Sequence, residues 1–105
     1  MGTFEQAVLL AVLRLRSGAY GRAVLNEVQV RLEREVAAGA VHATLTRLEG
    51  KGLLASRVGP GTEVRAGRPR RYYRLEPSGI RALNEARAAV NILWRGVKWP
   101  LKGHV

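Results

Sequence analysis

The spacing of apolar residues changes along this chain, and the order of the changes limits the folds open to it. Before Gly50, apolar residues recur at steps of three and four, which is helical spacing. Residues 53–58 and 71–75 have the composition of short strands, and Gly59-Pro60-Gly61 and Gly67-Arg68-Pro69 bracket the loop between them. A helical pattern resumes at Pro77, a residue favoured at the first helical position. The order predicts an α+β chain that is mostly α.

The first predicted helix, from Thr3 to about Arg16, is apolar on nearly every face. Thr3 followed by Gln6 predicts a capping box at its start. A helix that is apolar all round must be covered all round. In a chain of 105 residues, we expect one side to meet the core and the other a second subunit. Leu9 and Val12 are therefore predicted at a subunit interface.

Two further helices are expected before the strands. From Arg22 to about Glu35, an apolar stripe is accompanied by Glu27 and Arg31 at pairing distance. A third, shorter helix should follow Ala37-Ala38-Gly39 and end at Gly50 and Gly52. The inward residues of these two helices are predicted to be Val24, Leu25, Val28, Leu32, Val41, Leu45 and Leu48, with His42, Ala43, Thr46 and Arg47 on the outer face of the third helix.

The last helix carries a narrow apolar seam that favours dimerisation. Leu83, Ala86, Val90, Leu93 and Val97 alternate steps of three and four, as in a coiled coil. Of these, Leu83, Val90, Leu93 and Val97 are the predicted dimer contacts.

The order helix, helix, short helix, hairpin, long helix predicts a winged helix-turn-helix with an N-terminal helix and a long C-terminal dimerisation helix. Residues 1–76 would form the DNA-binding part and residues 77–105 the dimerisation helix and tail, within one compact domain overall. In this arrangement the third helix enters the major groove and the hairpin, or wing, lies along the backbone or minor groove.

Charge supports a polyanionic partner. Eighteen Lys and Arg against eight Asp and Glu give a formal net charge of +10. Residues 57–75 hold six arginines (Arg57, Arg65, Arg68, Arg70, Arg71 and Arg74) and one glutamate, so the predicted wing carries about half of the net charge. We therefore predict binding to double-stranded DNA.

Other classes of function have little support. The chain has no cysteine, which excludes disulfides and thiolate chemistry. The apolar run from Ala7 to Leu13 is too short to cross a bilayer, and no signal peptide fits. We expect no metal, no cofactor, no membrane partner and no enzymatic activity, and a cytoplasmic, nucleoid-associated location.

Candidate DNA contacts lie on the third helix and the wing. Arg47 and Thr46 are expected to read bases beside Ala43, since Arg can grip a guanine edge. Thr44 is expected to donate to phosphate or to cap locally, His42 to stack or donate to phosphate, and Lys51 to contact phosphate. On the wing, Arg68, Arg70 and Arg71 are expected on DNA, with Tyr72 exposed beside Arg70 and Tyr73 in the core.

The sequence also resembles the PadR-type bacterial transcriptional regulators between about Ala7 and Leu83. The marks are Ala19-Tyr20-Gly21, the run from Ala43 to Glu49 through Gly52-Leu53, and the segment Gly67-Arg68-Pro69-Arg70-Arg71-Tyr72-Tyr73-Arg74-Leu75, followed by Gly79. The resemblance implies a homodimer that represses promoters, often its own, with the last helix exchanged between subunits. Release by a small molecule or stress signal is also implied.

Three positions depart from the family pattern. His42 stands where the family usually has Tyr, Ala37 near a usual Ser cap, and Glu76 at a usual Thr. The short C-terminal region resembles a subgroup without a separate effector domain. Some members hold flat ligands between aromatic side chains of two subunits, which makes Trp94 a candidate contact for a small aromatic effector, although dimer packing is its ordinary role.

Two alternatives remain open at this point. An architectural protein that binds DNA without sequence preference would need only the basic wing. A regulatory module would instead bind a protein partner through the last helix and the Trp99 tail.

Overall fold

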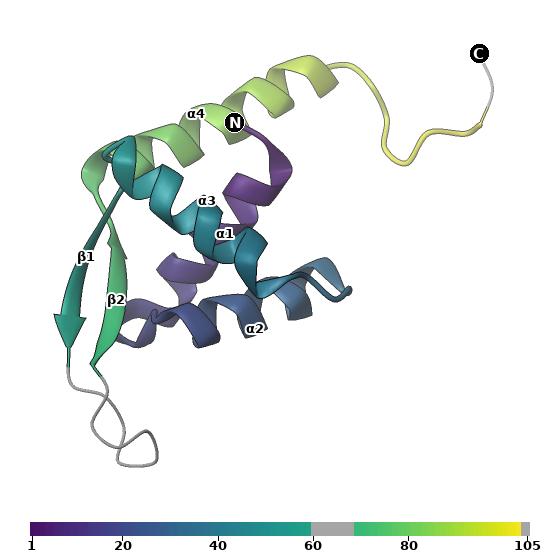
Figure 1. The fold of residues 1–105 in the computed structure, drawn as a ribbon. Helices are drawn as coiled ribbons and strands as arrows, with labels where there is room; N and C mark the ends of the chain where they lie inside the picture. The colour runs from purple at the N-terminus through teal and green to yellow at the C-terminus, as the bar shows by residue number, and fades with distance from the viewer. Residues whose placement is uncertain (60–68, 104–105) are drawn as a thin grey trace.

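The computed structural model of the protein describes residues 1–59 and 69–103. Its elements are α1 (Thr3–Leu15), the 3₁₀ turn η1 (Arg16–Gly18), α2 (Gly21–Leu32), α3 (Ala38–Gly50), β1 (Leu54–Gly59), β2 (Arg70–Leu75) and α4 (Pro77–Trp94). The first three helices pack together, the hairpin runs along one side of them, and α4 projects from the body (Figure 1). The predicted α+β, mostly helical class with a winged helix-turn-helix order is confirmed.

Helix α1 lies at the centre of the molecule and contacts α2, α3, β2 and α4. Leu9 and Val12 are 0% and 2% exposed and belong to the core of their own protomer. The prediction that they lie at a subunit interface is therefore wrong. Leu13, one turn after Leu9 on the same helix, is 51% exposed. An all-round apolar sequence did not reveal which side faces inward.

The start of α1 also differs from the prediction. Gly2 occupies the N-cap position, Thr3 is already helical, and no side chain caps the helix. The Gln6 Nε2 group instead donates a hydrogen bond to the Met1 carbonyl oxygen at 3.2 Å. The predicted capping box is absent because the helix begins one residue earlier than a Thr cap requires.

Helices α2 and α3 bury the predicted apolar stripes. Val24, Val28, Val41, Leu45 and Leu48 are all buried, and Leu25 and Leu32 pack against them. The predicted Glu27–Arg31 pair is present at 2.7 Å. Helix α2 ends three residues before the expected Glu35, because Glu33 adopts the left-handed conformation (φ 54°). At 13 residues, α3 is not shorter than the 12-residue α2.

The two strands form an antiparallel hairpin in which Leu54 lies opposite Leu75 and Ser56 opposite Tyr73. The prediction that Tyr73 is a core residue is confirmed, since it is 5% exposed. Its backbone N–H donates to the Ala19 carbonyl oxygen at 2.8 Å. This bond joins the outer edge of β2 to the segment just before α2, so the hairpin is fixed relative to the helices.

Helix α4 begins with Pro77, as predicted, and is anchored to the residues before β1. The Ser78 hydroxyl donates to the Gly52 carbonyl oxygen at 2.6 Å, and the Glu76 N–H donates to the Leu53 carbonyl oxygen at 3.0 Å. Within α4, Gly79 is the one buried residue. A side chain there would collide with the Leu53 carbonyl oxygen and the Leu75 side chain, so glycine permits this close approach.

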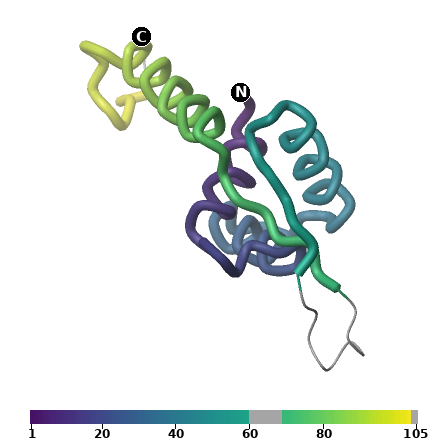
Figure 2. Tube along the Cα trace, turned by 90° about the vertical axis from the view of Figure 1, so that its left-hand side faces the viewer, coloured from purple at the N-terminus to yellow at the C-terminus, as the bar shows by residue number. Residues whose placement is uncertain are grey.

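Beyond its first turns, α4 leaves the body and points away from α2 (Figures 1 and 2). The radius of gyration is 16.3 Å, whereas a compact chain of this length has about 13 Å. The helix ends at Trp94, so Val97 of the predicted seam lies beyond it. Among residues 1–59 and 69–103, no helix has both the length and the apolar character needed to span a bilayer.

Candidate nucleic-acid interface

The outer face of α3 is exposed as the sequence predicts. His42, Ala43, Thr46 and Arg47 are all solvent-exposed, because the inward side of the helix is occupied by its buried apolar residues. Thr44 is different: it is 3% exposed and lies with the core. Its hydroxyl oxygen accepts a hydrogen bond from Arg47 Nη2 at 3.4 Å. Thr44 therefore has little surface to offer a phosphate and instead contacts the side chain next to it on the helix face.

Arg47 and Lys51 share one carboxylate on α1. Glu5 Oε2 accepts a hydrogen bond from Arg47 Nε at 3.2 Å and lies 3.5 Å from Lys51 Nζ. The hydrogen bond from Arg47, together with the charge of Lys51, lowers the pKa of Glu5 from its ordinary value, although partial burial acts in the opposite direction. Glu5 is thus ionised at neutral pH and holds two of the predicted DNA contacts.

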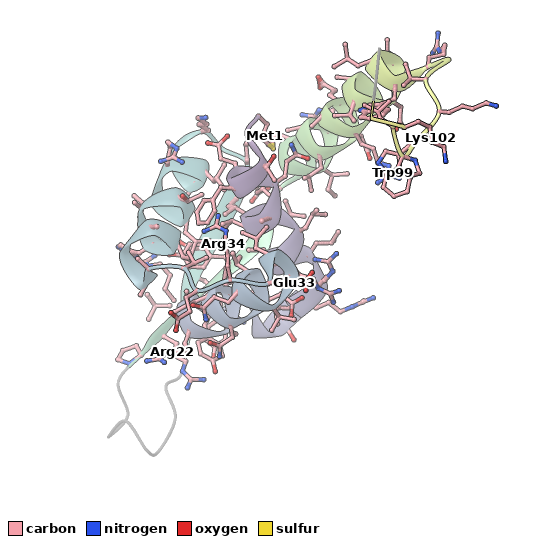
Figure 3. The ribbon with its side chains drawn as sticks, turned by 90° about the vertical axis from the view of Figure 1, so that its right-hand side faces the viewer. Met1, Arg22, Glu33, Arg34, Trp99 and Lys102 are labelled. Atoms are coloured by element: carbon pink, nitrogen blue, oxygen red, sulfur yellow. The ribbon has the colours of Figure 1, made fainter. Side chains whose placement is uncertain are left out.

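A basic groove lies between the starts of α2 and α3 and strand β2. Its volume is about 520 Å³, and its lining includes Arg22, His42, Arg70 and Arg71. Arg22 lies near the hairpin at the lower edge of the molecule in Figure 3. Gly21 and Ala38, the first residues of α2 and of α3, also line it. The N-termini of α2 and α3 carry the positive ends of the helix dipoles. Together with the three guanidinium groups, they make this groove suited to a phosphate.

Hydrogen bonds hold Arg71 on the hairpin. Its Nη1 donates to the Ser56 hydroxyl oxygen at 2.9 Å, and that hydroxyl donates to Glu49 Oε2 at 2.6 Å. These bonds connect the hairpin to the end of α3. Arg71 itself remains exposed, so its charge is available to a partner.

The tyrosines on the hairpin have two different environments. Tyr73 is in the core, where burial, and secondarily the charge of Glu49, raise its pKa from the ordinary value. Tyr72 is half-buried, not exposed as predicted, and its ring meets the Tyr20 ring edge-on at a centroid distance of 5.8 Å. Arg57 stacks on the Tyr72 ring at 5.1 Å from its centroid.

Several of these residues were not among the sequence candidates. Arg22 falls in the first turn of α2, directly after Ala19-Tyr20-Gly21, and its position at a helix start was the available signal. Glu5 carries no sequence signal, because its partners lie 42 and 46 residues away. The predicted contact Arg68 lies outside the described residues.

A second groove, which we call the α1–α4 groove, lies on the other side of the molecule from α2. Its volume is about 980 Å³. It is lined by Gln6, Leu10, Leu13, Leu75, Ile80, Leu83, Asn84, Arg87, Val90, Asn91, Trp94, Val97 and Trp99. Of the predicted seam, Leu83, Val90 and Val97 line the groove, whereas Leu93 does not and is 78% exposed. Trp99 lies past the end of α4 (Figure 3).

A helix-turn-helix followed by a hairpin, with an exposed α3 face beside a basic groove, defines a winged-helix DNA-binding protein. The chain belongs to the transcriptional regulator PadR-like family, whose model matches residues 9–85. Proteins of this family are transcriptional regulators and not enzymes.

Individual relatives agree with this assignment. The transcriptional regulator Rv3488 of Mycobacterium tuberculosis is 45% identical over 62 residues, which cover 59% of this chain and 54% of that protein. The chain thus spans about half the length of that relative. A PadR family regulator from Eggerthella lenta has 33% identity and a TM-score of 0.68, with 92% of this chain and 82% of the other covered. A PadR-like transcription factor from Bacteroides fragilis has 28% identity and a TM-score of 0.72, with 91% and 87% covered.

Proposed function

We propose that this protein is a homodimeric repressor that binds specific sequences of double-stranded DNA. Helix α3 of each subunit would enter the major groove and the hairpin would lie on the backbone or minor groove. The observation that carries the proposal is the position of the basic groove next to the exposed face of α3, with His42 belonging to both. One duplex lying on α3 would bring its phosphates to this groove.

The proposed contacts divide into base readers and phosphate contacts. Arg47 and Thr46 would read bases, and Ala43 would contact a thymine methyl group. The phosphate contacts would be His42, Lys51, Arg70 and Arg71, with Arg22 added from the structure and Arg68 kept on sequence grounds alone. Thr44 is left out of this set, since it is buried.

The proposed dimer would cover the exposed apolar residues of α4 and the tail. Val90, Leu93 and Trp94 are 48%, 78% and 39% exposed, and Trp99 is 79% exposed. Apolar side chains in such number on one projecting helix and the tail after it favour contact with another protein surface. A second copy of α4 laid against the α1–α4 groove would bury them and would place two α3 helices on one duplex.

The α1–α4 groove would also hold an effector. Small-molecule sites commonly have volumes of about 300–1,000 Å³ and mostly apolar walls. The groove has a comparable volume and contains both Trp94 and Trp99. We propose a small aromatic effector that stacks on Trp94, and a cytoplasmic, nucleoid-associated location that follows from the proposed role.

Fluorescence anisotropy tests the proposed function. A labelled duplex from upstream of the protein's own gene is titrated beside a random duplex of equal length, at several salt concentrations. Preference for one sequence by more than about a hundredfold supports a specific regulator. Equal affinity for an upstream duplex, for duplexes recovered by selection from random sequences and for the random duplex would favour the architectural alternative. No binding at low salt would favour a protein partner.

A further inference from the structure

The contact between Glu5 and Arg47 joins α1 to the face of α3 that is proposed to read DNA. Glu5 lies in the first turns of α1, and its side chain is 17% exposed. Arg47, at 50% exposure, and Lys51, at 54%, reach the same carboxylate oxygen from α3 and from the residue that follows it. A carboxylate at this position is unexpected on a surface proposed to bind DNA, because it repels phosphate groups.

The hydrogen bonds of Arg47 hold one edge of its guanidinium group. Nε donates to Glu5 at 3.2 Å, and Nη2 donates to the buried Thr44 hydroxyl at 3.4 Å. A guanidinium group has five N–H donors, so these two bonds leave three, including both on Nη1. A pair of such donors is what a bidentate contact to the O6 and N7 atoms of guanine requires. Glu5 and Thr44 thus brace the group without using all of its donors.

We infer that Glu5 is a specificity-determining positioning residue, which orients Arg47 for guanine and prevents Arg47 from acting as a general phosphate contact. The inference rests on the proposed function, since it assumes that Arg47 reads a base. An arginine already held in one geometry loses less side-chain entropy when it binds. The carboxylate is also repelled by phosphates, and this repulsion is offset only where Arg47 finds a matching base.

The lowered pKa of Glu5 is consistent with this role, because the group stays charged at the pH where DNA is bound. Thr44 also gains a role, because its buried hydroxyl oxygen accepts a hydrogen bond from Arg47 Nη2. Glu5 acts through the side chain of Arg47 and does not itself contact DNA.

The test compares the Glu5→Gln variant with the unchanged protein on two sets of duplexes. One set is the preferred sequence, recovered from upstream DNA or by selection from random duplexes, with each base pair changed in turn. The other is an unrelated duplex across a salt series. We expect Glu5→Gln to bind the unrelated duplex more tightly, with a log–log salt slope steeper by about one unit. Discrimination at the base pair read by Arg47 should fall by about tenfold.

Glu27→Gln is the matched control. It removes the same charge and breaks an ion pair of similar kind, the 2.7 Å contact with Arg31 within α2. This variant should keep the discrimination of the unchanged protein at every base pair. A second variant, Glu5→Asp, separates charge from position: it keeps the negative charge but cannot reach Arg47 in the same geometry. It should therefore lose discrimination while its affinity for unrelated DNA stays near that of the unchanged protein.

The outcomes distinguish this inference from the proposed function. If the unchanged protein shows no sequence preference, both are wrong. If it shows a preference that Glu5→Gln and Glu5→Asp retain in full, only the role of Glu5 is overturned. The same holds if Glu5→Gln reduces discrimination equally in an Arg47→Ala background, because Glu5 would then act without Arg47.

Discussion

The guanidinium group of Arg70 lies over the ring of Tyr20, 3.8 Å from its centroid. Tyr20 is the residue immediately before α2, and Arg70 is the first residue of β2. Both line the basic groove. The contact therefore holds a proposed phosphate-binding side chain against the helical body. Arg70 would then lose less conformational entropy when DNA binds.

Replacing Tyr20 by Leu should loosen this contact. A cation–π interaction at a partly desolvated site contributes about 0.5–2 kcal/mol. We expect Tyr20→Leu to lower the free energy of unfolding by about 1 kcal/mol and to weaken binding to all duplexes. Tyr20→Phe, which keeps the ring, is the control. Urea unfolding measures the free energy of unfolding, and anisotropy measures the affinity for DNA. If the Leu and Phe variants are equal in both quantities, the ring of Tyr20 does not hold Arg70.

The double variant Arg70→Ala/Arg71→Ala should weaken binding to every duplex by a similar factor. Each cation that leaves a phosphate flattens the log–log salt slope by about one unit, so a change of about two units is expected. Anisotropy over a salt series gives the slope. Arg31→Ala/Arg34→Ala, which removes equal charge from the last turn of α2 and the residues that follow it, should leave the slope within a fraction of a unit. An unchanged slope in the hairpin variant would remove the wing from the phosphate contacts.

The outer face of α3 could be predicted from sequence because its helical period is regular. Val41, Leu45 and Leu48 define the inward side, and the exposed residues follow from them. Thr44 was misplaced although the signal was present: it lies three residues after Val41 and next to Leu45, so the same period puts it inward. Its polar side chain suggested a DNA contact, but the packing of the helix determines that this position is buried.

Other features of the site could not be predicted from the sequence. Glu5 meets Arg47 across 42 residues, and no local pattern connects them. Leu9 and Leu13 lie on the same apolar helix, and only the packing of the other helices decides that Leu9 is buried and Leu13 exposed. The folded arrangement, not the composition of α1, determines which face is free for a partner.

Gly79→Ala tests how tightly α4 is docked. The added methyl group would overlap the Leu53 carbonyl oxygen, a backbone atom that cannot rotate away. We expect a loss of about 1–3 kcal/mol in the free energy of unfolding, as for other overpacked sites. Gly39→Ala is the control, since nothing lies within 4 Å of a side-chain carbon there. Urea unfolding of both variants measures the difference. A Gly79→Ala protein as stable as the control would contradict the close approach of α4 to Leu53.

Leu93→Glu and Leu13→Glu should each split the proposed dimer. Leu93 is 78% exposed on α4, and Leu13 is 51% exposed in the α1–α4 groove, so neither change introduces a charge into the core. Sedimentation equilibrium should show a dimer for the unchanged protein and a monomer for each variant. Glu85→Gln on α4 serves as a control. A dimer that survives both changes would place the subunit contact elsewhere.

The last prediction concerns the dependence of stability on pH. The pKa of Glu5 is lowered in the folded protein, first by the hydrogen bond from Arg47, relative to the ordinary value of 4.5. A carboxyl group of this kind stabilises the folded state at pH values above its unfolded pKa. That contribution is lost as the pH falls through the folded value. The difference in free energy of unfolding between the unchanged protein and Glu5→Gln should therefore be constant from pH 7 to about 5 and should shrink as the pH falls below 4.5.

Urea unfolding of the two proteins, measured in steps from pH 7 to pH 3, tests this directly. The same series in an Arg47→Ala/Lys51→Ala background is the control, because Glu5 has then lost both cations and the pH dependence of the difference should largely vanish. A difference that stays constant down to pH 3 in the unchanged background would mean that neither cation stabilises the Glu5 carboxylate. In that case the brace on Arg47 would have no electrostatic basis, and Glu5 would contribute only its packing to α1.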